Sequence, residues 1–100
     1  MENLIINHLT EIKKLFKRYG VKKAYLFGSA AKKQLSSNSD IDFLVDFSDK
    51  SDFEGYSNNY FNLLYALQDL LKKDVDLVAE ETLSNPYLIE SINQSKIQLL

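Results

Sequence analysis

Apolar side chains along this chain recur at two different spacings, and each spacing predicts a type of element. Between residues 3 and 19 they fall three or four positions apart, which is typical of an amphipathic helix and predicts one helix over that range. Lys17 and Arg18 in the last turn, followed by Gly20, form a common helix ending. The apolar stripe of this helix consists of Leu4, Ile5, Leu9, Ile12, Leu15, Phe16 and Tyr19.

Shorter apolar segments predict strands over residues 21–27, 40–47 and 75–79, with a short final strand within residues 96–100. In the second of these, apolar and acidic positions alternate, so the two sets lie on opposite faces of the strand. One face holds Ile41, Phe43, Val45 and Phe47, and the other holds Asp40, Asp42 and Asp46 with Leu44 between them.

Two further long helices are indicated by their start signals. A capping box at residues 51–54 precedes an apolar stripe at helical spacing that continues to Lys72 and Lys73. Asn85 can cap another helix, because Pro86 is favoured at the first helical position. The alternation of helices and strands predicts an α/β (α+β) fold with a small mixed sheet of three to four strands packed with helices.

Composition narrows the class of protein. With 100 residues, of which 45% are hydrophobic, we expect a single domain over residues 1–100 with a modest core. The absence of cysteine excludes disulfides and thiolate metal sites. No apolar stretch approaches the roughly 20 residues that cross a bilayer, and the N-terminus lacks a signal-peptide pattern. We therefore expect a cytoplasmic protein with no membrane partner.

Charge is distributed unevenly along the chain. Residues 1–39 hold eight basic and two acidic side chains, whereas residues 40–100 hold four basic and twelve acidic ones. Such asymmetry can mark a surface that faces a polyanion. Lys13, Lys14 and Lys17, however, lie opposite the apolar stripe of their helix, so we interpret them as a solvated face. Nucleic acid is accordingly the least favoured partner.

The most informative motif is Gly28-Ser29, followed after ten residues by Asp40-Ile41-Asp42. Helix-forming residues 30–35 after the Gly-Ser turn predict a short helix that begins at Ser29, and residues 36–39 predict a polar loop. Such a turn offers backbone N–H groups to an anion. Asp40 and Asp42 point to the same strand face, roughly 6–7 Å apart, and repel each other unless a cation joins them. The motif predicts a pocket for a metal-bound phosphate.

A third carboxylate is needed on a neighbouring strand to complete such a site. Asp76 is the best candidate because it interrupts an apolar strand, and Asp74 is the fallback. Asp46 would lie roughly 13 Å beyond Asp42 along its strand, too far to join the cluster. The lone histidine, His8, falls near an apolar stripe and favours packing or surface exposure over catalysis. Each acidic element alone is a weak indication of a metal-bound phosphate site, and the occurrence of all of them together is a stronger one.

Residues 26–29 and 39–45, with the gap between them, resemble the signature of the DNA polymerase beta-like nucleotidyltransferase superfamily. The short chain, the strand at residues 75–78 and the segment at residues 85–87 resemble its minimal members, the MNT proteins. These are often encoded beside a HEPN-domain protein. The resemblance covers roughly residues 21–100, and it implies a nucleotidyltransferase-like fold.

The resemblance also implies roles for individual residues. Gly28, Ser29 and Lys32 would bind the nucleotide phosphates. Asp40, Asp42 and Asp76 would hold two Mg²⁺ ions, and Asp76 would also help to deprotonate the acceptor hydroxyl. MNT proteins are similar to antitoxins that transfer AMP from ATP to a tyrosine of a HEPN toxin, or bind the toxin tightly, or do both. The resemblance to such antitoxins is compatible with either a homo-oligomer or a hetero-oligomer.

One departure from the family pattern bears on activity. Many relatives carry an arginine in a Ser-x-Ala-Arg-Gly run, where this chain has Lys32 followed by Lys33. Lysine keeps the positive charge but lacks the planar, bidentate grip of arginine on phosphate. The alternatives to an active antitoxin are therefore a binding antitoxin with weak or no catalysis, a small-molecule transferase of the aminoglycoside-modifying type, and an RNA-directed enzyme.

Overall fold

The structure is a computed structural model that describes residues 2–32, 39–48 and 53–100. The predicted capping serine at position 51, residues 33–35 of the predicted helix over residues 30–35 and loop positions 36–38 lie outside the described residues. None of the helices in the described ranges is long and apolar enough to span a membrane.

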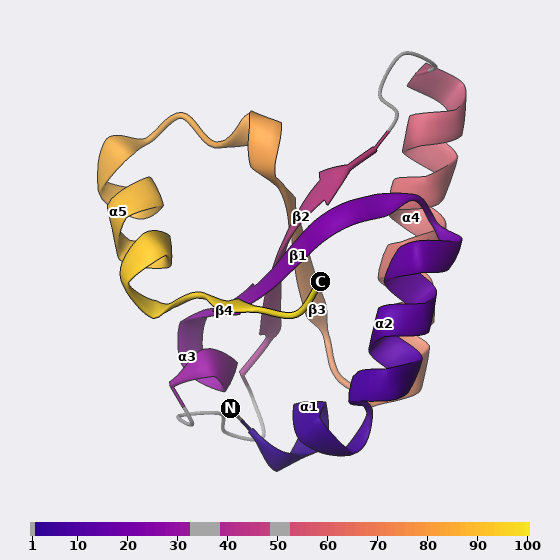
Figure 1. Cartoon of the computed structure of the whole chain (residues 1–100), viewed down its shortest axis with the longest axis horizontal. Helices are drawn as coiled ribbons and strands as arrows, with labels where there is room; N and C mark the ends of the chain where they lie inside the picture. The colour runs from indigo at the N-terminus through magenta and orange to yellow at the C-terminus, as the bar shows by residue number, and fades with distance from the viewer. Residues whose placement is uncertain (1, 33–38, 49–52) are drawn as a thin grey trace.

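Four strands form one mixed sheet in the order β3-β2-β1-β4 (Figure 1). They are β1 (Val21–Phe27), β2 (Ile41–Phe47), β3 (Val75–Ala79) and β4 (Ile97–Gln98). β2 runs parallel to β3, whereas β1 runs antiparallel to both β2 and β4. The predicted strands are present, and β4 is shorter than the segment predicted for it because only two of its residues pair with β1.

The predicted single helix over residues 3–19 is wrong. It is divided into α1 (Asn3–Asn7) and α2 (Leu9–Arg18) at His8. There the backbone N–H donates to the carbonyl of Ile5, three residues back instead of four, which tightens the turn and ends α1. The His8 ring also lies 2.8 Å from the carbonyl of Leu4 through Nδ1. Apolar spacing continues across this break, so the pattern alone did not reveal it.

The core lies between the sheet and the pair formed by α2 and α4 (Phe53–Leu71), on the right of the sheet in Figure 1. Phe16 of α2 meets Phe43 of β2 edge-to-face, with ring centroids 5.6 Å apart. The predicted apolar face of β2 is fully buried here, as are Leu63 and Leu67 of α4. The acidic face of β2 consequently points to the other side of the sheet, toward α3 (Gly28–Ala31) and α5 (Pro86–Ser95).

A short 3₁₀ helix, η1 (Glu80–Thr82), leads from β3 toward α5 and was not predicted. The predicted start of α5 is confirmed: the Asn85 side chain accepts hydrogen bonds from the backbone N–H groups of Tyr87, at 3.0 Å, and Leu88, at 3.4 Å. Pro86 occupies the first helical position, where the missing N–H costs nothing.

Replacing Asn85 by Ala is expected to lower the free energy of unfolding by about 1 kcal/mol, because two N–H groups at the start of α5 lose their acceptor. Thermal or urea unfolding measures this change. Ser84→Ala is the matched control, since Ser84 is an exposed residue directly before the cap and its substitution is expected to have little effect. Equal losses in both variants would show that the cap contributes nothing specific.

Candidate active site

The strand register brings the ends of three strands together around Asp42. Asp42 of β2 is paired with Asp76 of β3 on one side and with Phe27 of β1 on the other. Directly paired residues project to the same face of a sheet, about 5 Å apart, so the two carboxylates are neighbours. Asp40 lies two residues before Asp42, just outside β2, and is exposed like Asp76. Asp46 lies further along β2, opposite Lys23 rather than beside this cluster.

The environment of Asp42 disfavours its ionised form. Partial burial, then the negative charge of Asp76, then that of Asp40 raise the pKa of Asp42 from 3.8 to about 6. Both neighbours are therefore close enough to disfavour its ionised form. Such crowding of acidic groups is typical of a site that holds a cation.

Stability should depend on pH through this group. The native state binds more protons than the unfolded state between pH 3.8 and about 6, so the free energy of unfolding falls as pH rises through that window. In metal-free buffer Asp42→Asn is expected to remove this slope and raise stability at pH 7 by about 1 kcal/mol, after allowance for solvent screening. Thermal unfolding in EDTA from pH 4 to pH 7 measures it. An unchanged slope in the variant would contradict this prediction.

Two constraints require a glycine at position 28. Its φ of +70° lies in the left-handed region that side chains other than glycine's disfavour. A Cβ atom built on Gly28 would also overlap the carboxylate of Asp42. The glycine therefore lets the β1–α3 turn approach Asp42, which places any anion at this turn beside the acidic cluster.

The short helix after this turn differs from the prediction. α3 spans Gly28–Ala31 and has Phe27 as its N-cap, with no capping side chain, so Ser29 lies within its first turn rather than capping it. The cause is the left-handed conformation of Gly28, which turns the chain one residue earlier. Ser29 is half-buried and Lys32 is exposed directly after the helix, where its N–H donates to the carbonyl of Gly28.

The arrangement suits a cation that takes few protein ligands. Among the described residues, no group of three or more His, Cys, Asp or Glu side chains is close enough to form a complete metal site. Mg²⁺ in nucleotide sites usually takes one or two carboxylates and completes its shell with phosphates and water. Asp42 and its neighbours fit that requirement, because Asp42 is paired with Asp76 and lies against the turn at Gly28.

A small cavity of about 180 Å³ lies on the same face of the sheet as the cluster, at Leu44, two residues along β2 from Asp42. Its floor is Leu44, which is 3% exposed although it alternates with the acidic residues of β2. Apolar side chains of α5 and the preceding loop cover it, and Glu80, Asn93 and Lys96 add polar groups. Lys96 also lies over the ring of Tyr25, 4.5 Å from its centroid. The polar residues carried no sequence motif, and sequence reasoning missed them.

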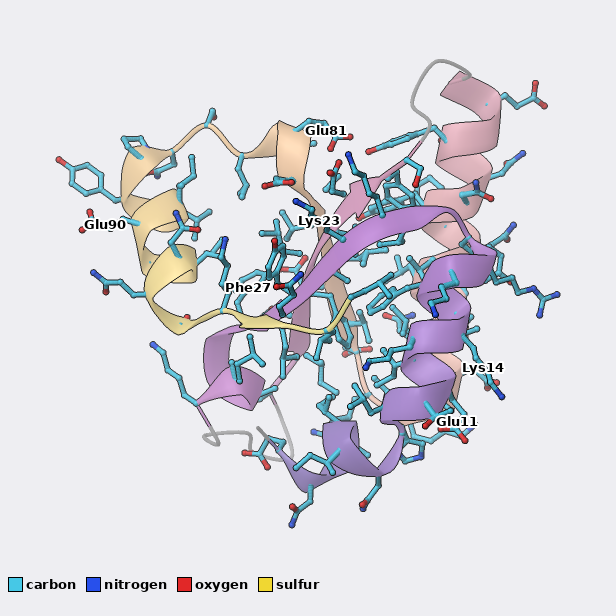
Figure 2. The ribbon with its side chains drawn as sticks, viewed as in Figure 1. Glu11, Lys14, Lys23, Phe27, Glu81 and Glu90 are labelled. Atoms are coloured by element: carbon cyan, nitrogen blue, oxygen red, sulfur yellow. The ribbon has the colours of Figure 1, made fainter. Side chains whose placement is uncertain are left out.

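The basic side chains of α2 lie away from this site. Figure 2 shows Glu11 and Lys14 on α2, on the opposite side of the sheet from Phe27 at the end of β1. Lys14 and Lys17 are exposed, in agreement with their interpretation as a solvated face, whereas Lys13 of the same predicted face is half-buried.

Comparison with known proteins decides the family. A profile of the polymerase beta nucleotidyltransferase family matches residues 10–100. The chain belongs to the polymerase beta nucleotidyltransferase family. The predicted class of enzyme, a nucleotidyltransferase, is thereby confirmed.

Individual relatives also support the assignment to the nucleotidyltransferase family. The chain is 37% identical over 90 residues to a protein of Methanocaldococcus jannaschii that is provisionally named a protein adenylyltransferase, covering 89% of this chain and 88% of the relative. A solved minimal nucleotidyltransferase, also a provisional name, superimposes with a TM-score of 0.76 at 28% identity, covering 96% of this chain and 95% of the other. This likeness confirms the predicted fold class.

Two solved toxin–antitoxin complexes are also similar to this nucleotidyltransferase. One contains AMP-PNP and matches with a TM-score of 0.73 and 29% identity, over 92% of this chain and 72% of that chain. The other is a tri-AMPylated HEPN toxin of Shewanella oneidensis in complex with an MNT antitoxin. It matches with a TM-score of 0.67 and 26% identity, over 95% of this chain and 71% of that chain. The predicted resemblance to MNT proteins is confirmed.

Proposed function

We propose that this nucleotidyltransferase is a Mg²⁺-dependent antitoxin that transfers AMP from ATP to a tyrosine hydroxyl of a HEPN toxin. The observation that carries the proposal is the pairing of Asp42 with Asp76 beside the turn at Gly28. It offers a phosphate position and a cation position next to each other. The cytoplasm is the expected location of such a module.

Each residue of the motif then has a task. The turn at Gly28 and Ser29 holds the phosphates of ATP, and Lys32 adds a positive charge nearby. Asp40 and Asp42 provide oxygen ligands for Mg²⁺, which when bound would offset the charge of the triphosphate and favour ionisation of the attacking hydroxyl. Asp76, at the outer strand, faces the acceptor and completes the set of carboxylates.

The reaction balances without any further reactant. The acceptor oxygen forms a bond to the α-phosphorus, the bond from that phosphorus to its bridging oxygen breaks, and pyrophosphate leaves. The hydroxyl proton passes to Asp76 or to water. Positioning and charge stabilisation account for most of the catalysis in such transfers.

The similar complexes support the choice of donor and acceptor. One toxin–antitoxin relative holds AMP-PNP, an ATP analogue, and the other contains a HEPN toxin that carries three AMP groups. The cavity floored by Leu44 gives a mixed apolar and polar surface next to the phosphate position, which suits a purine base.

The test is a label-transfer assay in which the product of the gene next to this chain's own gene is offered as the HEPN acceptor. With Mg²⁺, label in the α-phosphate of ATP is expected on the HEPN protein, whereas label in the γ-phosphate is expected in pyrophosphate. EDTA should abolish the transfer. Neutralisation of the toxin with no label moved would instead establish the binding antitoxin, and γ-label on the acceptor would refute AMP transfer altogether.

A further inference from the structure

The order of groups across the sheet gives the direction from which an acceptor must arrive. Gly28 follows β1, Asp42 lies on β2 and Asp76 lies on β3, in a row. In-line displacement needs the attacking oxygen opposite the leaving pyrophosphate. If the phosphates lie at Gly28, as the proposed function has it, the acceptor reaches the site over β3. The present inference therefore rests on the proposed function.

β3 is the edge strand on that side, and side chains already occupy several of its outward backbone groups. The N–H of Val75 donates to Gln68 Oε1 at 3.2 Å, and the carbonyl of Leu77 accepts from the hydroxyl of Tyr60 at 2.5 Å. The carbonyl of Ala79 accepts from the hydroxyl of Thr82 at 2.7 Å. Side-chain groups seated along this edge hinder the addition of another strand, so we expect a partner to dock through side chains.

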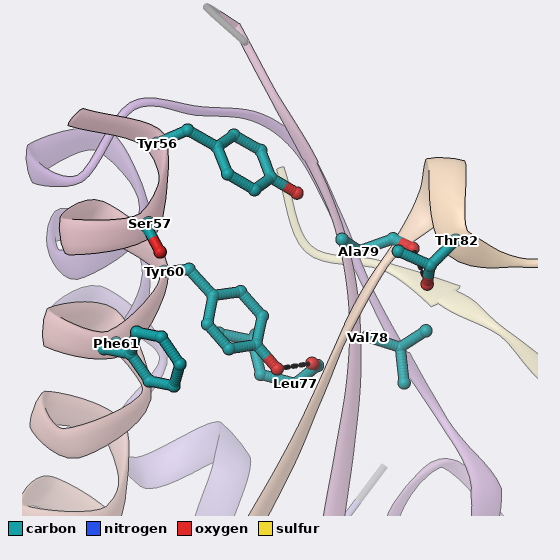
Figure 3. Close-up of a pocket in the computed structure, with 8 residues that line it drawn as sticks. All are labelled: Tyr56, Ser57, Tyr60, Phe61, Leu77, Val78, Ala79 and Thr82. Carbon is teal, nitrogen blue, oxygen red and sulfur yellow. Dashed lines mark hydrogen bonds between the residues drawn. The ribbon is translucent and has the colours of Figure 1, made fainter. Parts of the chain in front are cut away.

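A cavity of about 370 Å³ lies beside this edge, between α4 and the end of β3. Figure 3 shows Tyr56 and Tyr60 reaching from α4 toward the strand, with Phe61 below them and Thr82 on the far side. The Tyr56 ring packs edge-to-face on Phe47, with centroids 5.0 Å apart, and its hydroxyl donates to Glu81. The walls are mainly apolar and held in place by these contacts, as in a preformed pocket for one large side chain.

The aromatic surface continues out of the cavity along α4. Phe61 packs edge-to-face on Tyr60, at 5.1 Å between centroids, and stacks on Tyr65 at 6.4 Å. Phe61 is 48% exposed and Tyr65 is 60% exposed, so this pair contributes little to the core. Adjacent exposed aromatic side chains beside a pocket are typical of the centre of a protein interface.

The rim of this surface is acidic. Exposed carboxylates follow β3 and η1 at Asp74, Asp76, Glu80 and Glu81, and Glu81 is also the acceptor of the Tyr56 hydroxyl. A partner that approaches over this rim is favoured if its own surface is basic. Asp76 of this rim is also a member of the proposed catalytic cluster, so the rim reaches that cluster around the edge strand β3.

We propose that the Tyr56–Tyr60 cavity and the Phe61–Tyr65 pair dock the acceptor protein, which inserts an apolar side chain into the cavity and presents basic residues to the acidic rim. Docking there presents an acceptor hydroxyl to Asp76 from the side opposite Gly28. The surface sets the affinity for the acceptor and leaves the binding of ATP unchanged.

The experiment compares wild type with the double variant Phe61→Ser/Tyr65→Ser, and the probe is the same acceptor protein as in the label-transfer assay. Tyr87→Ser is the matched control, because Tyr87 is 83% exposed and lies on α5 instead. Three quantities are measured: the Kd of the HEPN protein without ATP, the acceptor KM and kcat of AMP transfer, and the thermal shift with Mg²⁺ and ATP.

In the double variant, Kd and KM for the acceptor are expected to rise at least about tenfold, as for loss of an aromatic interface centre. The kcat and the thermal shift should stay unchanged, and Tyr87→Ser should match wild type. In wild type, Kd should rise with added salt, because the rim and its partner attract each other. A wild type that binds the HEPN protein but transfers no AMP refutes the proposed function, and the Kd comparison still tests the docking surface.

Three results would overturn the docking surface. The first is an unchanged Kd in the double variant, and the second is no binding of the HEPN protein to wild type. The third is a concentration-dependent dimer of wild type that the double variant abolishes, which would assign the surface to a second copy of this chain.

Discussion

Asp42→Asn is expected to reduce AMP transfer by at least about 10³-fold, the scale of losing a charged group that stabilises the transition state directly. Asp42 is the central carboxylate of the row, paired with Asp76 and touching the space beside Gly28. Asparagine has nearly the same shape, so packing is preserved while the negative charge is lost. In wild type the crowded charges oppose folding in the absence of metal, and the variant should therefore be at least as stable.

The measurement pairs a rate of label transfer with thermal unfolding of the same preparation. Asp46→Asn is the control, since Asp46 lies on the same face of β2, opposite Lys23 and four residues from Asp42. Its transfer rate should stay within about threefold of wild type, as for a surface substitution away from the chemistry. A variant at position 42 that keeps full transfer, or that unfolds at a much lower temperature, would contradict the assignment.

Short strands were predictable because their signals are local. The segments that became β1 and β3 are bounded by turn residues and contain β-branched or aromatic side chains, and their bounds match the prediction. The break at His8 was not predictable, because Ile5 and Ile12 are both buried and the stripe runs on across it. Local hydrogen bonding at His8 ends α1, and apolar spacing carries no information about such backbone hydrogen bonds.

The candidate site was predictable in its residues but not in its surroundings. The motif located Gly28, Asp42 and Asp76, whereas their adjacency depends on the parallel pairing of β2 with β3. Tyr60 followed the helical stripe of α4 and resembled an ordinary core position. Its hydroxyl bond to the edge strand is a tertiary contact between residues seventeen positions apart. A spacing rule within one helix cannot show such a contact.

Gly28→Ala is expected to lower the free energy of unfolding by about 2–3 kcal/mol, combining a left-handed backbone with the displacement of Asp42. AMP transfer should fall by about 10²-fold, because a carboxylate moved by an ångström no longer holds the reacting groups in line. Gly20→Ala separates the two causes. Gly20 has a similar φ of +80°, but among the described residues an added Cβ there would meet only Asn59 Nδ2, at 3.6 Å.

A double-mutant cycle isolates the contact between the turn and the acidic cluster. In an Asp42→Ala background the added Cβ of Gly28→Ala no longer meets a carboxylate, so its cost should fall toward that of Gly20→Ala. The coupling free energy between positions 28 and 42 is expected to be about 1 kcal/mol, which urea unfolding resolves. A coupling near zero would mean that the glycine serves the backbone turn alone, and that the approach of the turn to Asp42 has no energetic consequence.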